Sequence, residues 1–141
     1  MKRRRRTRIL VEGSPELLFH LSAEAESAHD VKDVDDPSAG LVMMRLRDTA
    51  RKDAFYLGEV LVTEAKVRIG GILGLGLIRG DRPDEARRLA VVDAVFNSES
   101  PLLADWIPRL EDEERRIAEG LERETSSILE TRVDFSTMET F

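Results

Sequence analysis

The chain of 141 residues contains no cysteine and only two histidines, His20 and His29. The absence of cysteine excludes a disulfide framework, a thiolate metal site and a cysteine nucleophile. Zinc and iron sites usually need at least two well-placed nitrogen or sulfur ligands, so the histidine content also argues against a histidine-rich metal site. We therefore expect no metal centre and no cofactor held by this chain on its own.

Aromatic residues and long apolar runs are also scarce. Aromatics make up 5% of the chain and hydrophobic residues 41%, whereas charged residues make up 35%. This composition predicts a thin core that leaves room for a partner to complete it. No apolar run is long enough to cross a bilayer, and the interruption at residues 12–15 excludes a secretory signal. We expect a cytoplasmic protein without membrane contact.

Positive charge is concentrated near the N-terminus, at Lys2, Arg8 and the run from Arg3 to Arg6, although the formal net charge is −6. An acidic body argues against binding to duplex DNA, which needs a broad positive face. The arginine run has no interleaved aromatic residues, so it offers no stacking surface for a single strand. We interpret residues 1–12 as a basic helix or arm that is solvated or pairs with the acidic surface of a partner.

The pattern of polar and apolar residues predicts two N-terminal helices followed by antiparallel strands. The first helix covers residues 2–12 and ends at Gly13, and the second starts at Ser14, whose hydroxyl caps it, and runs to about residue 26. A weak strand around Val31, a turn at 36–40 and strands at 41–47, 54–69 and 72–78 follow, joined by a polar connection at 48–53 and by Gly70-Gly71. Short connections without helices are typical of an antiparallel meander, here of about four strands.

Two long helices and a tail complete a single α+β domain of residues 1–141. The first helix covers 83–97, and the second starts near Pro101, is interrupted by Pro108 and ends at about Glu130. The second helix carries a narrow apolar stripe, typical either of a coiled-coil seam or of a solvated helix lightly docked on the sheet. Residues 131–141 form an irregular tail that a partner would order. We predict that the stripe and the tail bind a partner through Leu110, Ile117, Leu121, Ile128, Arg132, Val133, Asp134, Phe135, Thr137 and Met138.

The glycines at positions 74, 76 and 80 come close to a dinucleotide-binding fingerprint, but their spacing misses it by one residue. They also lie within an apolar strand, and no helix opens directly after the second glycine, as the Rossmann turn requires. We instead predict that these glycines let another backbone or a neighbouring helix approach the sheet closely.

The loop between the last strand and the first long helix is a candidate phosphate site. Its backbone N–H groups lie beside two guanidinium groups, an arrangement that suits a phosphate. The alternative is that the loop only caps the helix through its aspartate while the arginines stay solvated. The predicted phosphate-proximal residues are Arg79, Gly80, Asp81 and Arg82.

No residue pattern predicts catalysis by this chain alone. Glu59 and Glu64 are five residues apart in an extended run and therefore face opposite sides of a strand. Asp93 lies among apolar residues and is expected to pair with an arginine. No Ser-His-Asp order, P-loop or kinase signature is present. We predict no catalytic residue.

An ordered set of stretches extends over nearly the whole chain: residues 40–42, 58–67, 74–76, 90–94 and, most specific, the tail at 132–138. This set resembles the PhnG family, the G subunit of the bacterial carbon–phosphorus lyase core complex. The resemblance implies an accessory subunit that assembles with the H, I and J subunits, most closely with I, and transiently with the ATP-binding-cassette-like K and L proteins.

The resemblance also implies a reaction for the assembly. With the H, I and L proteins, the G subunit is required for a phosphonate to displace adenine from ATP, which gives a ribose 1-phosphonate 5-triphosphate. ATP, with magnesium, would be a substrate of the complex, and the later radical cleavage belongs to the iron–sulfur J subunit. Two alternatives stay open: a homodimeric scaffold that pairs through the last helix, and an independent nucleotide-hydrolysing enzyme.

Overall fold

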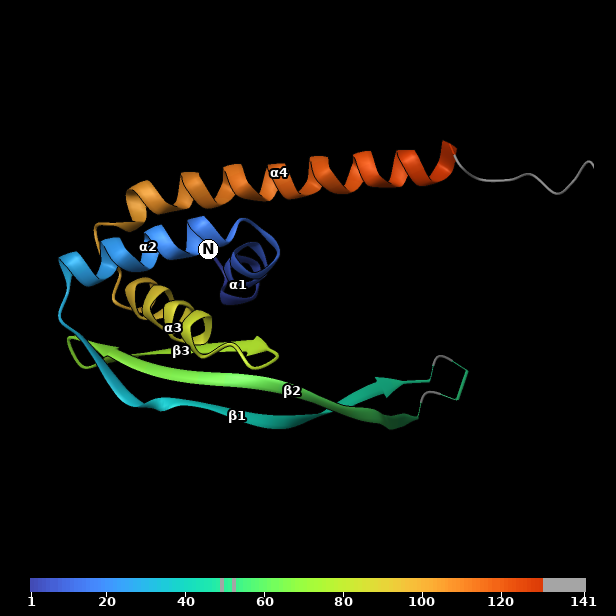
Figure 1. Ribbon diagram of the computed structural model, residues 1–141, viewed down its shortest axis with the longest axis horizontal. Coiled ribbons are helices and arrows are strands. Elements are labelled where there is room, and N and C mark those ends of the chain that lie inside the picture. Colours follow the sequence, from blue (N-terminus) through green and yellow to red (C-terminus); the bar gives the residue numbers. More distant parts are fainter. Residues whose placement is uncertain (49, 52, 131–141) are drawn as a thin grey trace, which may run out of the picture.

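The computed structural model describes residues 1–48, 50, 51 and 53–130, which form four helices and three strands (Figure 1). The predicted α+β class, the N-terminal helices, the antiparallel meander and the two long C-terminal helices are confirmed. In chain order the elements are α1 (Arg3–Glu12), α2 (Pro15–Ala28), β1 (Val31–Arg47), β2 (Ala54–Ile69), β3 (Ile72–Arg79), α3 (Pro83–Asn97) and α4 (Leu103–Glu130).

The sheet has the strand order β1-β2-β3, with both pairs antiparallel. It has three strands where about four were expected, because the turn predicted at 36–40 does not form. Instead β1 continues through these residues, and two register shifts between Asp33 and Ser38 leave Pro37 without a partner in β2. Proline has no N–H to donate to a ladder, but β1 is an edge strand, where such an irregularity is tolerated.

Gly70 and Gly71 connect β2 to β3, as predicted, with φ angles of +56° and +83°. Two successive residues with positive φ form the hairpin turn whose twist matches that of the strands, and glycine adopts this conformation without steric cost. β3 then pairs only with residues 62–69 of β2. Consequently β1 and β2 continue beyond β3 as a two-stranded ribbon (Figure 1).

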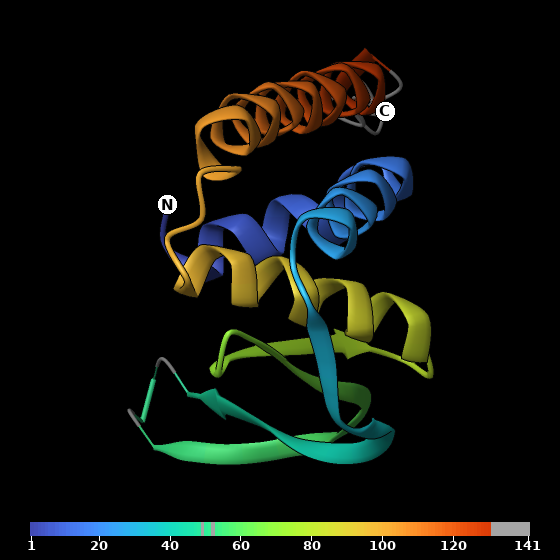
Figure 2. The same cartoon turned by 90° about the vertical axis from the view of Figure 1, so that its left-hand side faces the viewer.

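α3 lies on one face of the sheet and separates it from the other helices, with α4 outermost (Figure 2). Two glycines of β3 make this close contact possible. A Cβ atom on Gly74 would collide with the carbonyl oxygen of Ala90, and one on Gly76 with that of Ala86. The prediction that these glycines let a neighbouring helix approach the sheet is therefore confirmed.

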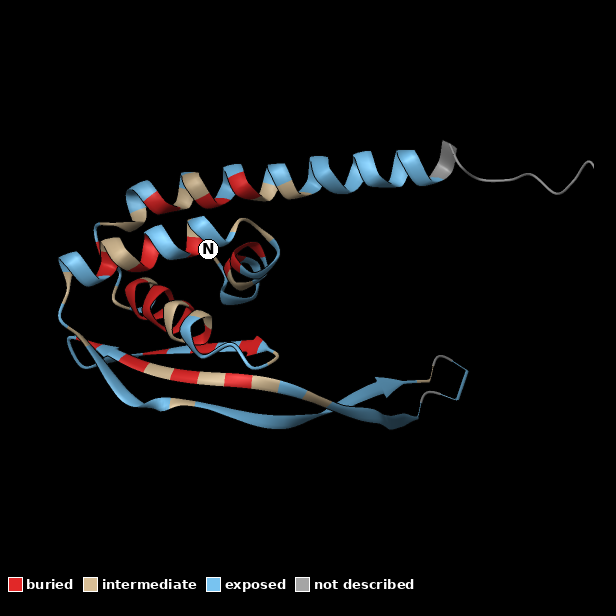
Figure 3. Ribbon diagram, viewed as in Figure 1, coloured by how far each residue is buried: buried red, intermediate tan, exposed pale blue. Residues whose placement is uncertain are grey.

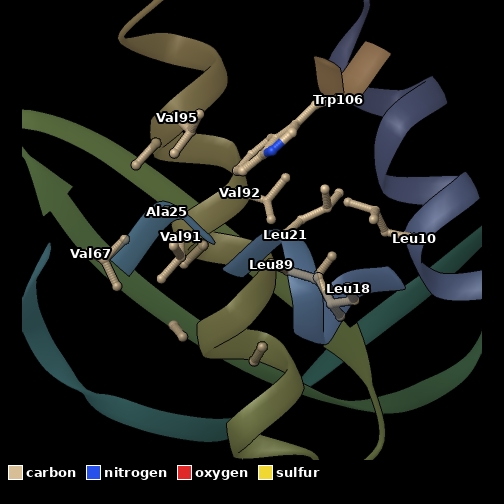
Figure 4. Packing of buried hydrophobic residues seen from close by; sticks show 14 of the residues in the cluster. Leu10, Leu18, Leu21, Ala25, Val67, Leu89, Val91, Val92, Val95 and Trp106 are labelled. Carbon is tan, nitrogen blue, oxygen red and sulfur yellow. The ribbon is translucent and has the colours of Figure 1, made fainter. Parts of the chain in front are cut away.

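The core lies between the sheet, α3 and α2, and it reaches the first turns of α4 (Figure 4). Val67 of β2, Val91 of α3, Leu21 of α2 and Trp106 of α4 are fully buried. Trp106 donates its indole N–H to Glu24 Oε2 at 2.9 Å. The one polar atom of this large side chain therefore has a partner, so the ring can be buried without a desolvation penalty.

α1 and α2 meet at Gly13 and Ser14, where the sequence predicts the boundary. Ser14 occupies the N-cap position of α2, but its hydroxyl does not accept a bond from the helix. The hydroxyl donates to the carboxylate of Glu16 instead. The predicted capping role of this hydroxyl is therefore wrong, because a nearby charged acceptor competes for it.

α4 begins at Leu103 and continues through Pro108 without a break (Figure 1). The predicted interruption is wrong because Pro108 lies within the first two turns, where the missing N–H removes one hydrogen bond near the helix start and leaves the later ladder intact. Among the described residues, no helix is both long enough and apolar enough to cross a membrane.

Candidate functional site

The exposed ribbon of β1 and β2 is the first candidate surface for binding a partner. We define the ribbon as residues 41–47 of β1 and 54–61 of β2. Pairs such as Leu41 with Leu61 and Leu46 with Phe55 join its two strands. A two-stranded ribbon with no further strand or helix against it is marginally stable in water. This part of the molecule therefore lacks the support that the rest of the sheet receives from β3 and α3.

Apolar side chains cover both faces of the ribbon. Leu41 is 64% exposed and Tyr56 is 62% exposed. Opposite residues share a face and successive residues alternate, so Leu41 and Leu61 lie on one face while Val42 and Val60 lie on the other. Figure 3 shows that almost the whole ribbon is exposed. Its exposed apolar residues are Leu41, Val42, Met43, Met44, Leu46, Phe55, Tyr56, Leu57 and Leu61.

Sequence reasoning predicted these strands but missed the ribbon as a surface. The available signal was the nearly continuous apolar run at 41–46, matched by a second one at 55–62. Strands that are apolar on both sides are typical of positions covered on both faces. Nothing among the described residues covers them.

α4 changes character along its length. Trp106 and Leu110 are fully buried, and Ile117 is half-buried. Beyond them Leu121 is 58% exposed and Ile128 is 63% exposed, in the half of the helix that projects from the body (Figure 3). The first half of α4 is therefore docked, but on α1 and α2 and not on the sheet as predicted. The second half is exposed, and its role as a coiled-coil seam stays a prediction.

Leu110 requires a correction, because it was assigned to the partner-binding stripe. Its side chain is buried in the chain's own core and packs with the residues that surround Trp106. Nearby, the buried carboxylate of Glu113 accepts the Ser14 N–H at 2.7 Å, which ties α4 to the start of α2. The candidate seam is thus Ile117, Leu121 and Ile128. The predicted tail residues Arg132, Val133, Asp134, Phe135, Thr137 and Met138 lie outside the described residues.

The predicted phosphate loop is built around the hydroxyl of Thr63. This hydroxyl donates to Gly80 O at 2.6 Å and accepts the Arg82 N–H at 3.0 Å. Gly80 has a φ of +90° and donates its own N–H to Leu61 O at 2.8 Å. α3 begins at Pro83, so its N-cap position is Arg82 and the predicted cap by Asp81 is wrong.

Several donors of this loop already have partners. The Arg82 guanidinium pairs with Glu85, and the acidic side chains of Asp84 and Glu85 lie in the first turn of α3, where they offset the helix dipole. Arg79 is exposed and has no carboxylate partner among the described residues. The phosphate role of the loop stays a prediction, and it rests mainly on Arg79.

The carboxylate of Asp93 in α3 binds two arginines of α1 and also accepts hydrogen bonds from β3 and α3. Arg3 donates to its two carboxylate oxygens from Nε and Nη2, both at 2.9 Å, and buried Arg6 donates from Nη2. The Leu75 N–H and the Asn97 side-chain amide donate to Oδ2 at 3.0 and 3.2 Å. This confirms the predicted arginine pairing of Asp93 and joins α1, α3 and β3 at one group.

These contacts determine the charge state of Asp93. Burial alone would raise the pKa of the carboxyl group, but the Leu75 N–H and the two guanidinium groups outweigh burial and hold the pKa below its ordinary value. Arg5 pairs in turn with Glu114, and Arg8 with Glu12. Residues 3–12 thus form the helix that was one of the two predicted possibilities, and Arg3, Arg5 and Arg6 pair with carboxylates of this chain. Pairing of the other basic side chains with a partner stays a prediction.

The absence of a catalytic residue stays a prediction. No group of three or more His, Asp or Glu side chains within them could hold a metal ion. His29 Nε2 lies 3.0 Å from Ser100 Oγ, but no carboxylate in the described part of the chain orients this imidazole. Glu64 pairs with Lys66 at 2.5 Å and is not part of a carboxylate dyad.

Comparison with known proteins identifies the family of the chain. Residues 1–140 match the sequence profile of the family described as "Phosphonate metabolism protein PhnG". Over 116 residues the chain is 39% identical to the alpha-D-ribose 1-methylphosphonate 5-triphosphate synthase subunit PhnG of Rhizobium meliloti (strain 1021), a match that covers 77% of this chain and 70% of the relative. The chain therefore belongs to the phosphonate metabolism protein PhnG family.

Proposed function

We propose that this chain is an accessory subunit of a cytoplasmic phosphonate ribosyl-triphosphate synthase within the carbon–phosphorus lyase system. Its role is to complete an assembly that transfers ribose triphosphate from ATP to an alkylphosphonate with release of adenine. ATP and its magnesium are substrates of that assembly, and this chain binds no cofactor of its own. Family membership supports the reaction class, and the exposed ribbon is the observation that supports a role through assembly.

The ribbon supports this role because its two faces need cover at the same time. Soluble monomers rarely expose a contiguous apolar patch of more than a few hundred Å², and larger patches mark interaction sites. A partner that clamps both faces of a ribbon buries more area than one that contacts a flat surface. Such an interface falls in the class of permanent complexes, on the order of 2,000 Å² or more.

The bare half of α4 supports a second contact with a partner. We assign the seam of Ile117, Leu121 and Ile128, together with the tail, to the I subunit, and the H and J subunits to the rest of the assembly. Binding of the K and L proteins is transient in this proposal. Arg79 is the residue of the loop that would approach a phosphate of ATP or of the phosphonate.

A reconstitution experiment tests the proposal. Adenine release from ATP and methylphosphonate is measured with the H, I and L proteins, in the presence and absence of this chain. We expect release only when the chain is present. The double substitution Tyr56→Ser with Leu57→Ser should weaken the assembly by about a hundredfold or more and lower adenine release accordingly, since each of the two buried apolar side chains contributes roughly 1.5–3 kcal/mol.

Phe19→Ser is the matched control, because Phe19 is 51% exposed on α2, outside the ribbon. It should leave both measurements near the wild-type values. Adenine release at the full rate without this chain would contradict the proposed function. Normal assembly of the ribbon variant would contradict the assignment of the ribbon as the partner surface.

The exposed seam of α4 also favours one alternative, a homodimeric scaffold in which two copies pair through this helix. Spacings of four and seven residues between Ile117, Leu121 and Ile128 fit a coiled-coil seam. Light scattering of the isolated chain distinguishes the two functions. A stable particle of twice the chain mass that persists when the H and I subunits are added would favour the scaffold.

A further inference from the structure

The free edge of β3 is a second unpaired feature of the sheet. β3 pairs with β2 on one side only. Gly80 donates its N–H to Leu61 O and so faces β2, and in an antiparallel ladder the backbone groups of successive residues alternate in direction. The odd-numbered residues Leu73, Leu75 and Leu77 therefore direct their N–H and C=O groups to the free edge.

Side chains of α3 satisfy one end of this edge and leave the other end open. Asn97 Nδ2 donates to Leu73 O at 2.9 Å, and Asp93 Oδ2 accepts the Leu75 N–H at 3.0 Å. Among the described residues, neither the C=O of Leu75 nor the N–H and C=O of Leu77 has a hydrogen-bond partner. Proteins normally block exposed edge groups, because an open edge pairs readily with another chain.

A cavity of about 530 Å³ adjoins the open end of the edge. α1 forms one side of this cavity, the edge of β3 forms another, and α3 contributes Leu89 and Val92. Leu10 of α1 adds a further apolar side chain. A strand added at Leu77 would lie along the opening, so its inward-pointing side chains could enter an apolar space.

The charged side chains around the cavity determine which charge an added strand should carry. Asp93 already engages Arg3 and Arg6, whereas Arg4 lines the cavity and has no carboxylate partner among the described residues. Arg79, at the end of the same strand, is similarly exposed. A second copy of this chain would bring like charges against these arginines, so edge-to-edge pairing of two copies is disfavoured.

We propose that the open edge of β3 takes an extended segment of a partner subunit as a fourth strand. About four residues of this segment, at ~3.3 Å per residue, would pair with Leu75 and Leu77. An apolar side chain of the segment occupies the cavity, and a carboxylate next to it pairs with Arg4. The identity of the partner, one of the H, I and J subunits, rests on the proposed function, but the surface is separate from the ribbon.

A pair of proline substitutions tests the fourth strand. Leu77→Pro removes the central N–H of the open edge without removing a bond to β2, because Leu77 faces away from β2. Leu73→Pro is the matched control, since it changes the same residue type on the same edge but away from the cavity. We expect the affinity of the labelled chain for a mixture of the H, I and J subunits to fall about tenfold for Leu77→Pro and to stay within about twofold for Leu73→Pro.

Amide hydrogen exchange of the wild-type chain tests the same point without a substitution. Exchange of the Leu77 amide should slow by about tenfold or more when the H, I and J subunits assemble with the chain. An unchanged exchange rate at Leu77 in an assembly that releases adenine would overturn the fourth strand alone. Adenine release that does not need this chain would overturn the proposed function, whatever the exchange rate at Leu77.

Discussion

At the residue scale, Asp93 connects three parts of the chain that are far apart in sequence. Its side chain is 5% exposed, and that of Arg6, which pairs with it, is 7% exposed. Arg3 contributes a second guanidinium group from the solvent side, where it is 57% exposed. Breaking a buried charge pair by removing one charge leaves the other charge uncompensated, which is strongly destabilising.

We predict that Asp93→Asn lowers the free energy of unfolding by about 3 kcal/mol or more, because Arg6 then stays buried without a counter-charge. Urea unfolding at neutral pH measures this change. Asp84→Asn on the same helix is the control, since Asp84 is exposed and should change stability by less than about 0.5 kcal/mol. Equal losses for the two variants would show that the Asp93 cluster does not stabilise the fold.

The same cluster predicts a pH dependence of stability. The pKa of Asp93 is lower in the folded chain than its ordinary value of 3.8. Its contribution is therefore complete above that value and is lost as the pH falls through the folded pKa. Urea midpoints of the wild type, measured from pH 7 to pH 2, should fall toward those of Asp93→Asn in acid. A constant gap between the two curves would contradict this prediction.

At the element scale, one apolar stripe runs along α4, but it is buried in the first half of the helix and exposed in the second half. Its first half supplies Trp106 and Leu110 to the core, whereas its second half presents Leu121 and Ile128 to solvent. Ile117 still packs against the core, whereas the later turns of the helix are exposed and extend beyond the body of the molecule (Figure 3). A helix can continue past its support when its own backbone hydrogen bonds are complete, so the bare half remains available for a partner.

Leu110→Ala and Leu121→Ala separate the two halves of α4. Leu110→Ala should lower the free energy of unfolding by about 2–5 kcal/mol, because it opens a cavity in the core. Leu121→Ala should change stability by less than about 0.5 kcal/mol and should weaken binding to the I subunit. Urea unfolding and a binding titration with that subunit measure the two effects. A large loss of stability for Leu121→Ala would mean that this half is not bare in solution.

At the scale of the whole molecule, most of the large exposed apolar residues lie on two extensions of the body, the ribbon and the second half of α4. The core lies where α3 meets the sheet, whereas the ribbon and the second half of α4 extend from it in the same general direction (Figure 1). Two apolar extensions of this kind are typical of a protein that binds another molecule through them.

We predict that the isolated chain binds a hydrophobic dye strongly and self-associates as its concentration rises, because the ribbon is apolar on both faces. Dye fluorescence and light scattering measure these properties. Addition of the H, I and J subunits should reduce the fluorescence severalfold. The Tyr56→Ser, Leu57→Ser variant should bind less dye on its own, and dye binding equal to that of the wild type would place the exposed apolar surface elsewhere.

Several features could be predicted from the sequence because their causes are local. The Gly70-Gly71 turn and the helix at 83–97 follow from short-range steric rules. The close approach of α3 at Gly74 and Gly76 was indicated by the lack of a Cβ atom at these positions. The errors occurred where two local signals competed. Pro37 indicated a turn, but pairing with β2 on both sides carried the strand through it. Similarly, the position of Pro108 near the start of α4 reduced its effect on the helix.

The sequence by itself determined the fold class, the order of the helices and strands and the family, since these depend on patterns along the chain. Only the tertiary structure decided which apolar residues are buried and which charged side chains pair with one another. Leu110 and Leu121 are both leucines of the same apolar stripe. Leu110 is buried because other helices pack beneath it, whereas Leu121 lies where that helical layer ends and is exposed. The arginines of α1 likewise look available along the sequence, but Asp93 and Glu114 meet them from elements about a hundred positions away. Burial and charge pairing depend on distances in space, which the spacing of residues along a chain does not specify.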